Sequence, residues 1–399
     1  MEQATAFLQK ALAKVATNLH HFFSHSQARA VGLTFAADSL MFGSWITHIP
    51  HVKTRLGLND AELGIALFGM PLGLLLMNPI SPALLHRFGL APTTIFSTLA
   101  MAVSFALPIW MPERWSLMAA LCLVGMSVAL MNVAMNTCAT NLERAEGIFI
   151  MSSCHAMWSL GGMVGSGTSA ALMSAGLVPT THLTGLAALV FVAALIWLRP
   201  ALAKIPDEKS PDAVAPKFAF PNRDLLLMIF IGLCVSLAEG VAFDWSAVFL
   251  HDQLGAAPNV AALGFACFSL TMMAMRFTGD VLIPRFGERK LLYFSILTTM
   301  LALMVVIFSP NPAVGIFGFL VLGAGVALGA PILFNASARV PGYAQGAGLA
   351  TYATFSFVGF LAGPPLIGLV GERFGLPVGF AIVVALALAA VPATGRVRL

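Results

Sequence analysis

The chain has 399 residues, of which 59% are hydrophobic and 10% are charged, and its formal net charge is +4. Soluble domains contain about 25% charged residues, so this composition excludes an ordinary soluble protein and predicts a membrane protein. The five cysteines all fall in hydrophobic stretches, without the paired spacing of a metal site or of a disulfide framework. We therefore expect no metal and no cofactor.

Residues 1–27 precede the first long apolar stretch. From Leu8 to Phe22 an apolar residue recurs at alternating spacings of four and three, and the lysines of this segment lie off that stripe. The pattern is typical of an amphipathic helix that lies in the membrane interface. A poorly ordered tail is the alternative.

Twelve mainly apolar stretches follow, each about 20 residues long, which is the length that a transmembrane helix needs. We expect interruptions in the second and the eleventh stretch, around residues 79–82 and 363–365, where prolines gather. The sequence therefore predicts an all-α membrane protein with twelve transmembrane helices. Their centres lie near residues 40, 72, 101, 126, 160, 188, 237, 270, 299, 324, 357 and 384.

The basic residues are distributed unevenly between the two sides of the membrane. With the N-terminus placed inside, the cytoplasmic segments hold sixteen lysines and arginines, whereas the outer loops hold four: Lys53, Arg55, Arg114 and Arg373. Basic residues concentrate in cytoplasmic loops. Both termini are therefore expected in the cytoplasm.

The longest connection, residues 200–222, is rich in Pro, Lys, Asp and Glu. A connection of that length usually marks a boundary between domains or repeats. We interpret it as a cytoplasmic linker between two six-helix bundles, residues 28–199 and residues 223–399.

The two bundles carry the same landmarks in the same order, at offsets between 197 and 200 residues. Such a series indicates an internal repeat. The matched pairs are Trp45 and Trp245, Gly64 and Gly264, Arg87 and Arg285, and Ser159 and Ser356.

The turns after spans two and eight resemble the loop motif Gly-x-x-x-Asp-Arg-x-Gly of the major facilitator superfamily. In the first copy, which ends in Arg87-Phe-Gly, His86 replaces the Asp, and in the second copy Pro284 does so. These departures weaken the usual picture of a paired gating carboxylate in the first half. The resemblance implies two same-orientation six-helix halves with a solute site near the membrane midplane between them.

A more specific resemblance lies in spans four and five. The stretch Asn132-Val-Ala-Met-Asn136, followed by residues 151–162, is similar to the YbjJ-like branch of the superfamily, which is related to the fucose permease-like group. This resemblance implies solute transport. In that branch an acid often stands at the position of Asn132, so its absence puts proton handling on span four in doubt.

Three acids interrupt spans one and seven, although a charged side chain at the bilayer centre costs about 2.5–3.5 kcal/mol on insertion scales. Asp38 lies about ten residues, or roughly 15 Å, into span one, and Trp45 follows on the same helix face. This face can hold a cation, a proton or a ring stacked on Trp45. The alternatives are a structural acid that is hydrogen-bonded to a neighbouring helix and an aromatic side chain that only packs.

Glu239 and Asp244 lie in span seven, five residues apart. In an α-helix this spacing separates them by about 140°, so we expect that they do not face the same point. Glu239 is expected to face the cavity, and Asp244 a neighbouring helix or the outer vestibule. Burial favours the neutral form of a carboxyl group, which suits a proton carrier.

Amide side chains occur in two other spans that the resemblance places around the cavity. Asn132 and Asn136 are four residues apart in span four, and Asn335 lies in span ten. Amides both donate and accept hydrogen bonds, which suits a solute with hydroxyl groups, although hydrogen bonding between helices is the alternative. His155 in span five is interpreted as a proton relay or a solute ligand, or else as a packing donor.

Several arginines are interpreted as parts of a gate. Arg276 and Asp280 are four residues apart in span eight, a spacing that permits pairing, and we expect them to form a network with Arg144 or Arg339. The complete set of predicted gating residues is Arg87, Arg144, Arg276, Asp280 and Arg285.

These observations predict a secondary active transporter of a small polar organic solute, sugar-like or nucleoside-like, that is coupled to protons and works by alternating access. It is expected to be a monomer in the inner membrane of a bacterium, in contact with lipid and protons but not with nucleic acid. No nucleophile–base pair suggests an enzyme. The alternatives are a proton-coupled exporter of a cationic metabolite or drug and, more distantly, a receptor that does not transport.

Overall fold

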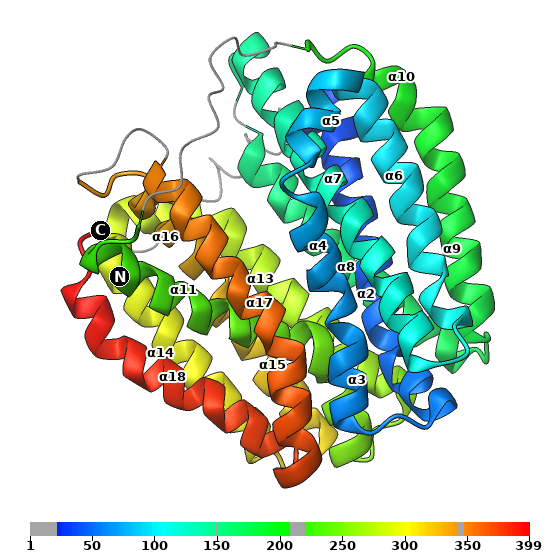
Figure 1. Cartoon of the computed structure of the whole chain (residues 1–399), viewed down its shortest axis with the longest axis vertical. Coiled ribbons are helices and arrows are strands. Elements are labelled where there is room, and N and C mark those ends of the chain that lie inside the picture. Colours follow the sequence, from blue (N-terminus) through cyan, green and yellow to red (C-terminus); the bar gives the residue numbers. More distant parts are fainter. Residues whose placement is uncertain (1–21, 149, 208–219, 342–346) are drawn as a thin grey trace, which may run out of the picture.

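The computed structural model describes residues 22–148, 150–207, 220–341 and 347–399, and this part of the chain is helical (Figure 1). Most of the predicted N-terminal segment (residues 1–21) and the centre of the predicted linker (residues 208–219) lie outside the described residues. The predicted all-helical fold class is confirmed.

The first half contains six membrane crossings. Helices α2 and α8 pack against each other along much of their length. The crossings are α2 (Ser26–Leu56); α3 (Asp60–Leu67), α4 (Gly69–Met77) and α5 (Ser81–Phe88) together; α6 (Leu90–Ala106); α7 (Arg114–Glu146); α8 (Met151–Ser174); and α9 (Pro179–Ala193), which continues through the π-helical segment η2 (Ala194–Leu198) into α10 (Arg199–Leu202).

The second half repeats this arrangement. Its first crossing contains two π-helical segments, η3 and η4, which interrupt the α-helix. The crossings are α11 (Arg223–Gly240), η3 (Val241–Trp245), α12 (Ser246–Val248) and η4 (Phe249–Gln253) together; α13 (Pro258–Phe286); α14 (Glu288–Ile307); α15 (Pro312–Val326) with α16 (Gly329–Ser337); α17 (Ala347–Phe374); and α18 (Leu376–Arg396).

Ten of the described helical segments are long and apolar enough to cross a membrane. Helices α2, with 31 residues, and α8, with 24 residues, complete the twelve predicted spans. The expected interruption of span two is confirmed, because α4 ends at Met77 and α5 begins at Ser81. The expected interruption of span eleven is wrong: α17 continues through Pro364 and Pro365, as helices in membranes can when neighbouring groups satisfy the freed backbone.

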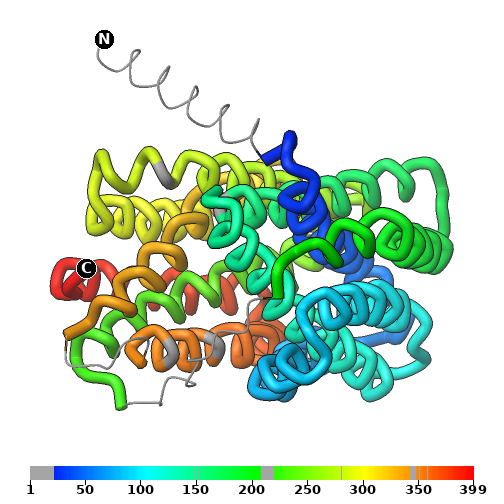
Figure 2. Tube along the Cα trace, turned by 90° about the horizontal axis from the view of Figure 1, so that it is seen from above, coloured from blue at the N-terminus to red at the C-terminus, as the bar shows by residue number. Residues whose placement is uncertain are grey.

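The two halves lie side by side (Figure 2). They meet along α8 and α13, and again where α3 packs against α17. At the end of the molecule where α10 leads into the linker, hereafter the linker end, α5 and α16 stand apart (Figure 1). The opposite end, where α2 turns into α3, is hereafter the outer end, and there α3 and α17 are in contact.

Local sequence fixes the turn at the outer end. Gly57 adopts a left-handed conformation, with a φ of 62°, and ends α2. Asn59 then caps α3: its side chain accepts a hydrogen bond from the backbone of Glu62, whose side chain accepts one from the backbone of Asn59. This reciprocal cap satisfies backbone donors at the start of a helix. It holds the first turn of α3 against the second half of the molecule.

Backbone packing closes the outer end. A Cβ atom at Gly64 of α3 would lie 2.5 Å from the carbonyl oxygen of Pro364 in α17, and one at Gly368 would lie 2.5 Å from the carbonyl oxygen of Asp60. Small residues let helix backbones approach closely in membranes. These two glycines therefore permit a contact between the halves that no other residue allows without movement.

Polar contacts reinforce this closure. The backbone N–H of Asp60 donates to Oε2 of Glu372 in α17 at 3.0 Å. Nδ2 of Asn259, at the start of α13, donates to Oγ of Ser174, at the end of α8, at 2.8 Å. Both bonds join the first half to the second.

Lys53, Asp60 and Asp252 form an ion-pair cluster, which we call the outer latch. Nζ of Lys53 lies 2.5 Å from Oδ1 of Asp60 and 2.5 Å from Oδ2 of Asp252. Lys53 and Asp60 belong to the first half and Asp252 to the second, so the ammonium group ties the halves together. The three side chains are largely buried, at 14%, 13% and 26% exposure, and burial protects such pairs from screening by salt.

Replacing Lys53 with Gln is expected to open the outer end more often, because Asp60 and Asp252 then repel each other. Spin labels on Glu113→Cys and Arg373→Cys, which are exposed near the outer ends of the two halves, would report this in a background without the native cysteines. The distance distribution should shift to longer values in Lys53→Gln but not in Lys53→Arg. Identical distance distributions in the parent protein and in both variants would show that the latch does not hold the outer end closed.

The outer latch is expected to hold throughout the physiological pH range. Burial of the ammonium group lowers the pKa of Lys53, but its hydrogen bonds with Asp252 and Asp60 outweigh this effect and raise that pKa above the ordinary value of 10.5. A group whose pKa is raised by folding stabilises the folded state below its unfolded pKa and loses that contribution as the pH rises through the folded pKa. The same label distance should therefore stay constant between about pH 6 and pH 9.

Candidate solute site between the two halves

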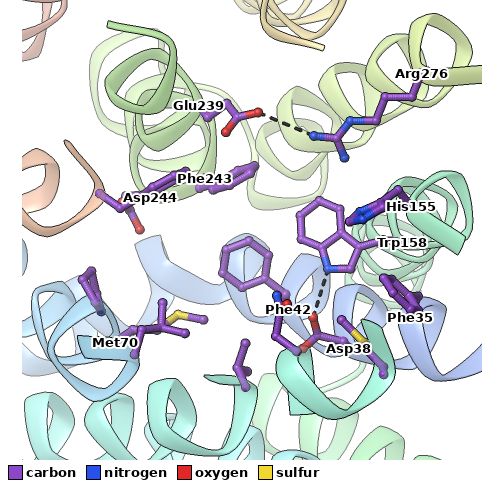
Figure 3. A pocket seen from close by; sticks show the side chains of 16 residues that line it. Phe35, Asp38, Phe42, Met70, His155, Trp158, Glu239, Phe243, Asp244 and Arg276 are labelled. Carbon is purple, nitrogen blue, oxygen red and sulfur yellow. Dashed lines mark hydrogen bonds and ion pairs between the residues drawn. The ribbon is translucent and has the colours of Figure 1, made fainter. Parts of the chain in front are cut away.

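A cavity of about 300 Å³ lies between the two halves. Its wall consists mainly of aromatic and aliphatic side chains, with a few polar groups that converge on the same space (Figure 3). Ligand sites commonly combine an apolar wall with a few placed polar groups. The polar and charged residues that line it are Asp38, Asn132 and His155 from the first half and Glu239, Asp244 and Arg276 from the second.

Asp38 is held by the indole of Trp158. Asp38 is 4% exposed, and its Oδ2 accepts a hydrogen bond from Nε1 of Trp158 at 2.9 Å. Its Oδ1 is buried and has no hydrogen-bond partner among the described residues. A buried carboxyl oxygen without a partner costs free energy, which points to a role for Asp38 beyond packing.

Glu239 and Arg276 form a second buried unit. The guanidinium NH2 of Arg276 lies 3.6 Å from Oε1 of Glu239, and its NH1 donates to Oγ of Ser159 at 3.3 Å. Its Cζ is 5.9 Å from the centre of the Trp158 ring, within the range of a cation–π interaction. Trp158 thus contacts both units, so Asp38 of one half and Glu239 of the other are connected through two side chains.

This arrangement corrects the prediction for Arg276. The guanidinium lines the central cavity and contacts Glu239 and Ser159 instead of forming a gate with Arg144 or Arg339. Arg339 instead donates to the carboxylate of Glu288. The side chain of Asp280 lies outside the described residues.

The expectation that Asp244 faces a neighbouring helix or the outer vestibule is also wrong. Both side chains line the same cavity (Figure 3). The reason is η3, the π-helical turn Val241–Trp245 that follows Glu239. Hydrogen bonds in a π-helix run from residue i to residue i+5, so each residue of η3 turns the chain by a smaller angle than in an α-helix. The angle between Glu239 and Asp244 is therefore smaller than an α-helical projection predicts.

An aromatic cluster joins the halves beside these groups. The ring centre of Phe42 lies 5.3 Å from that of Phe243 and 6.2 Å from that of Phe265, both with nearly perpendicular planes. Trp158 lies 6.1 Å from Phe243. Edge-to-face pairs at these distances are favourable. We call Phe42, Trp158, Phe243 and Phe265 the aromatic layer.

The remaining predicted ligands are divided between the cavity and its surroundings. Asn132 and His155 are exposed to the cavity. Asn136 does not line it; its Nδ2 donates to Oδ1 of Asn132 at 2.8 Å. Trp45 is 2% exposed and lies outside the cavity lining, because seven residues along α2 place it about 10 Å beyond Asp38. Asn335 is exposed on α16, also outside the lining.

The predicted gating arginines of the loops remain untested. Arg87, Arg144 and Arg285 are exposed. Arg87 and Arg285 occupy matching positions in the repeat, and each guanidinium lies over the ring of the next residue, at 5.4 Å and 5.5 Å from the ring centre. Their role in gating stays a prediction.

Trp158 and Phe243 belong to the site, although the sequence did not single them out as ligands. Trp158 follows His155 by three residues, so a helical projection places both on one face of span five. Phe243 directly precedes Asp244. Aromatic residues are too common in membrane helices for either position to stand out without the fold.

Replacing Trp158 with Phe is expected to destabilise the protein, because the change keeps a ring but leaves Asp38 without its donor. The loss should be about 1–3 kcal/mol, measured as thermal unfolding of the purified protein. Trp245→Phe is the matched control, since the indole nitrogen of Trp245 is buried without a hydrogen-bond partner among the described residues. Equal losses in the two variants would contradict the assignment.

Comparison with known sequences leads to one family. The sequence profile of the Major Facilitator Superfamily matches residues 31–256 and 228–396. An uncharacterized MFS-type transporter of Yersinia pestis is 31% identical over 371 residues, which are 93% of this chain and 95% of the relative. The membrane protein MosC of Rhizobium meliloti is 29% identical over 350 residues, which are 87% of this chain and 84% of MosC.

Solved structures share the architecture at low sequence identity. The nucleoside transporter NupG matches with a TM-score of 0.70 and 12% identity, over 93% of this chain and 99% of NupG. A D-xylose-proton symporter matches with a TM-score of 0.72 and 13% identity, over 94% and 98% of the two chains. The fucose:proton symporter FucP of E. coli matches with a TM-score of 0.62 and 16% identity, over 93% and 99%. Identities this low establish the fold alone.

Proposed function

Since the chain belongs to the major facilitator superfamily, we propose that it is a secondary active transporter that moves a small polar organic solute by alternating access and couples this movement to protons. Within the superfamily we place it in the YbjJ-like, fucose permease-like branch, on the motifs of spans four and five. We further propose that it acts as a monomer in a bacterial inner membrane.

One observation carries this proposal: carboxyl groups from both halves face one cavity between them. Asp38 comes from the first half and Glu239 and Asp244 from the second. A site shared by two halves changes its shape when the halves rock, so binding and movement are linked. Ionisable residues inside membranes are expensive and commonly mark pathways of solutes and protons.

We assign proton coupling to Asp38 and Glu239. Each is less than a tenth exposed, and each has one buried oxygen without a hydrogen-bond partner among the described residues. Protonation of Glu239 would cancel the charge that holds Arg276, and protonation of Asp38 would remove the cost of its unpaired oxygen. Either event changes the contacts of Trp158, which belongs to the interface between the halves.

The cavity supports a solute with a ring-shaped body. Phe42, Trp158 and Phe243 present ring faces and edges, and Asn132 offers an amide that can donate and accept. The transporters of nucleosides, xylose and fucose named above share the fold, which is consistent with a solute of that size. A volume of about 300 Å³ is at the small end of ligand pockets.

A ligand screen followed by transport tests the proposal. Purified protein would be heated in the presence of sugars, nucleosides, amines and organic acids, because a ligand raises the melting temperature by mass action. Liposomes that contain only this protein should then accumulate a stabilising solute against its gradient when a pH gradient is imposed. Binding without any flux would contradict transport, and flux that ignores the pH gradient would contradict proton coupling.

A further inference from the structure

The three carboxyl groups of the cavity differ in their partners. Asp38 accepts a hydrogen bond from Trp158, and Glu239 lies beside the guanidinium of Arg276. Asp244 has neither a hydrogen bond nor an ion pair among the described residues, although its half-buried side chain lines the cavity. Asp38 and Glu239 each have one partner, so among the described residues Asp244 is the carboxyl group of the cavity that has none.

The cationic groups of the cavity are engaged elsewhere. Arg276 lies on the far side of Glu239 and Phe243 from Asp244 (Figure 3), where Glu239 balances its charge. His155 lies with its ring 5.3 Å from that of Phe35, beside Trp158 and likewise away from Asp244 (Figure 3). A carboxylate at Asp244 thus has no counter-ion of its own.

The charge balance of the cavity favours a positively charged occupant. With the imidazole of His155 neutral, the charged side chains of its lining are three carboxyl groups and one guanidinium. When Arg276 balances Glu239, and one further carboxyl group carries the coupling proton, one negative charge remains. An uncompensated charge inside the membrane-spanning part of a protein is costly, so a solute that brings a single positive charge is held best.

The neighbours of Asp244 suit such a group. Phe243 precedes it in the chain, and the rings of Phe42, Phe243 and Phe360 line the same cavity as Asp244. Aromatic faces attract an ammonium group when it loses its water. The backbone beside the carboxylate is also open, because a Cβ atom at Gly240 would stand 4.0 Å from Oδ2 of Asp244 and meet no other atom within that distance.

We propose that Asp244 is the anchor of the transported solute and that it selects a protonated amine on a ring-sized body. This inference rests on the proposed function and deepens it, since it separates the residue that holds the solute from Asp38 and Glu239, which carry protons. The π-helical turn η3 is what brings Asp244 into the cavity.

Two pairs of probes test the proposal, and the two members of each pair differ only in the amine: D-glucosamine with D-glucose, and 2-phenylethylamine with 2-phenylethanol. Affinities would be taken from the rise in melting temperature with probe concentration at neutral pH. In at least one pair the amine is expected to bind tenfold or more tightly than the alcohol. Equal affinity within both pairs, or no binding by any probe, would overturn the proposal.

Variants test whether Asp244 causes the preference for the amine. Asp244→Asn should abolish the preference for the amine, and Asp244→Glu should keep the preference. Asp224→Asn is the matched control, because Asp224 lies on α11 in the same crossing but outside the cavity lining, near Arg398. A preference for the amine that survives in Asp244→Asn would exclude Asp244 as the anchor.

The outcomes also separate this inference from the proposed function. Accumulation of an uncharged sugar, without any preference for amines, would leave the transport proposal standing and remove the anchor. Binding of amines through Asp244 without uptake by liposomes under a pH gradient would refute the transport proposal and leave Asp244 as the binding residue.

Discussion

Liposomes that contain Asp38→Asn or Glu239→Gln are expected to lose uphill accumulation of the solute while they still exchange it. Neither amide can take up a proton, but each keeps the shape of the side chain. A gradient of about two pH units stores about 2.7 kcal/mol per proton, which corresponds to a roughly 100-fold accumulation. The ratio of labelled solute inside to outside should fall from that value to about one in both variants.

The two substitutions differ in their structural cost. Asn at position 38 can still accept the hydrogen bond of Trp158. Gln at position 239 leaves the buried charge of Arg276 without its counter-ion, which costs about 3–5 kcal/mol when one member of a buried pair is removed. The double variant Glu239→Gln/Arg276→Gln should therefore regain stability but not accumulation. Concentrative uptake at the wild-type level in both single variants would refute their role.

Replacing Gly368 with Val is expected to reduce transport tenfold or more, because the outer end can no longer close. The new side chain would meet the backbone of Asp60 and Gly64 in the other half, and backbone atoms cannot move aside without separating α3 from α17. The contact joins the two halves and lies within neither of them. The change should therefore block the cycle and leave each half folded.

Spin labels at Glu113→Cys and Arg373→Cys would show the blocked state directly, as a shift to longer distances at the outer end. Gly167→Val is the matched control, since no neighbouring atom lies within 4 Å of a Cβ atom at that helical glycine. Transport that is equally reduced in Gly167→Val, or unchanged in Gly368→Val, would show that the close approach is not required.

The fold could be predicted from the sequence because the membrane imposes simple rules. Apolar length marks each span, the basic loops give its direction, and the repeated landmarks such as Trp45 and Trp245 divide the chain into halves. The continuous helix through Pro364 and Pro365 could not be predicted, since a membrane helix tolerates proline when its surroundings satisfy the backbone.

The site could be predicted only in part. Asp38, Glu239 and Asp244 stand out because an acid in an apolar span is costly, and all three line the cavity. The partner of Arg276 is Glu239, which lies on another helix. The four-residue spacing of Arg276 and Asp280 along α13 therefore did not indicate this ion pair. The π-helical turn after Glu239 has no signature in the sequence, yet it changes the direction of Asp244. Trp45 shares a helix face with Asp38, but periodicity carries no information about depth.

The aromatic layer has a consequence for the idle protein. Phe42 and Phe265 are 9% and 0% exposed, and their rings fill the space between the halves beside the buried carboxyl groups. Hydrophobic constrictions exclude water. Without a continuous chain of water molecules, protons cannot leak through the protein from one compartment to the other. The proton gradient across the membrane is thus preserved while no solute is bound.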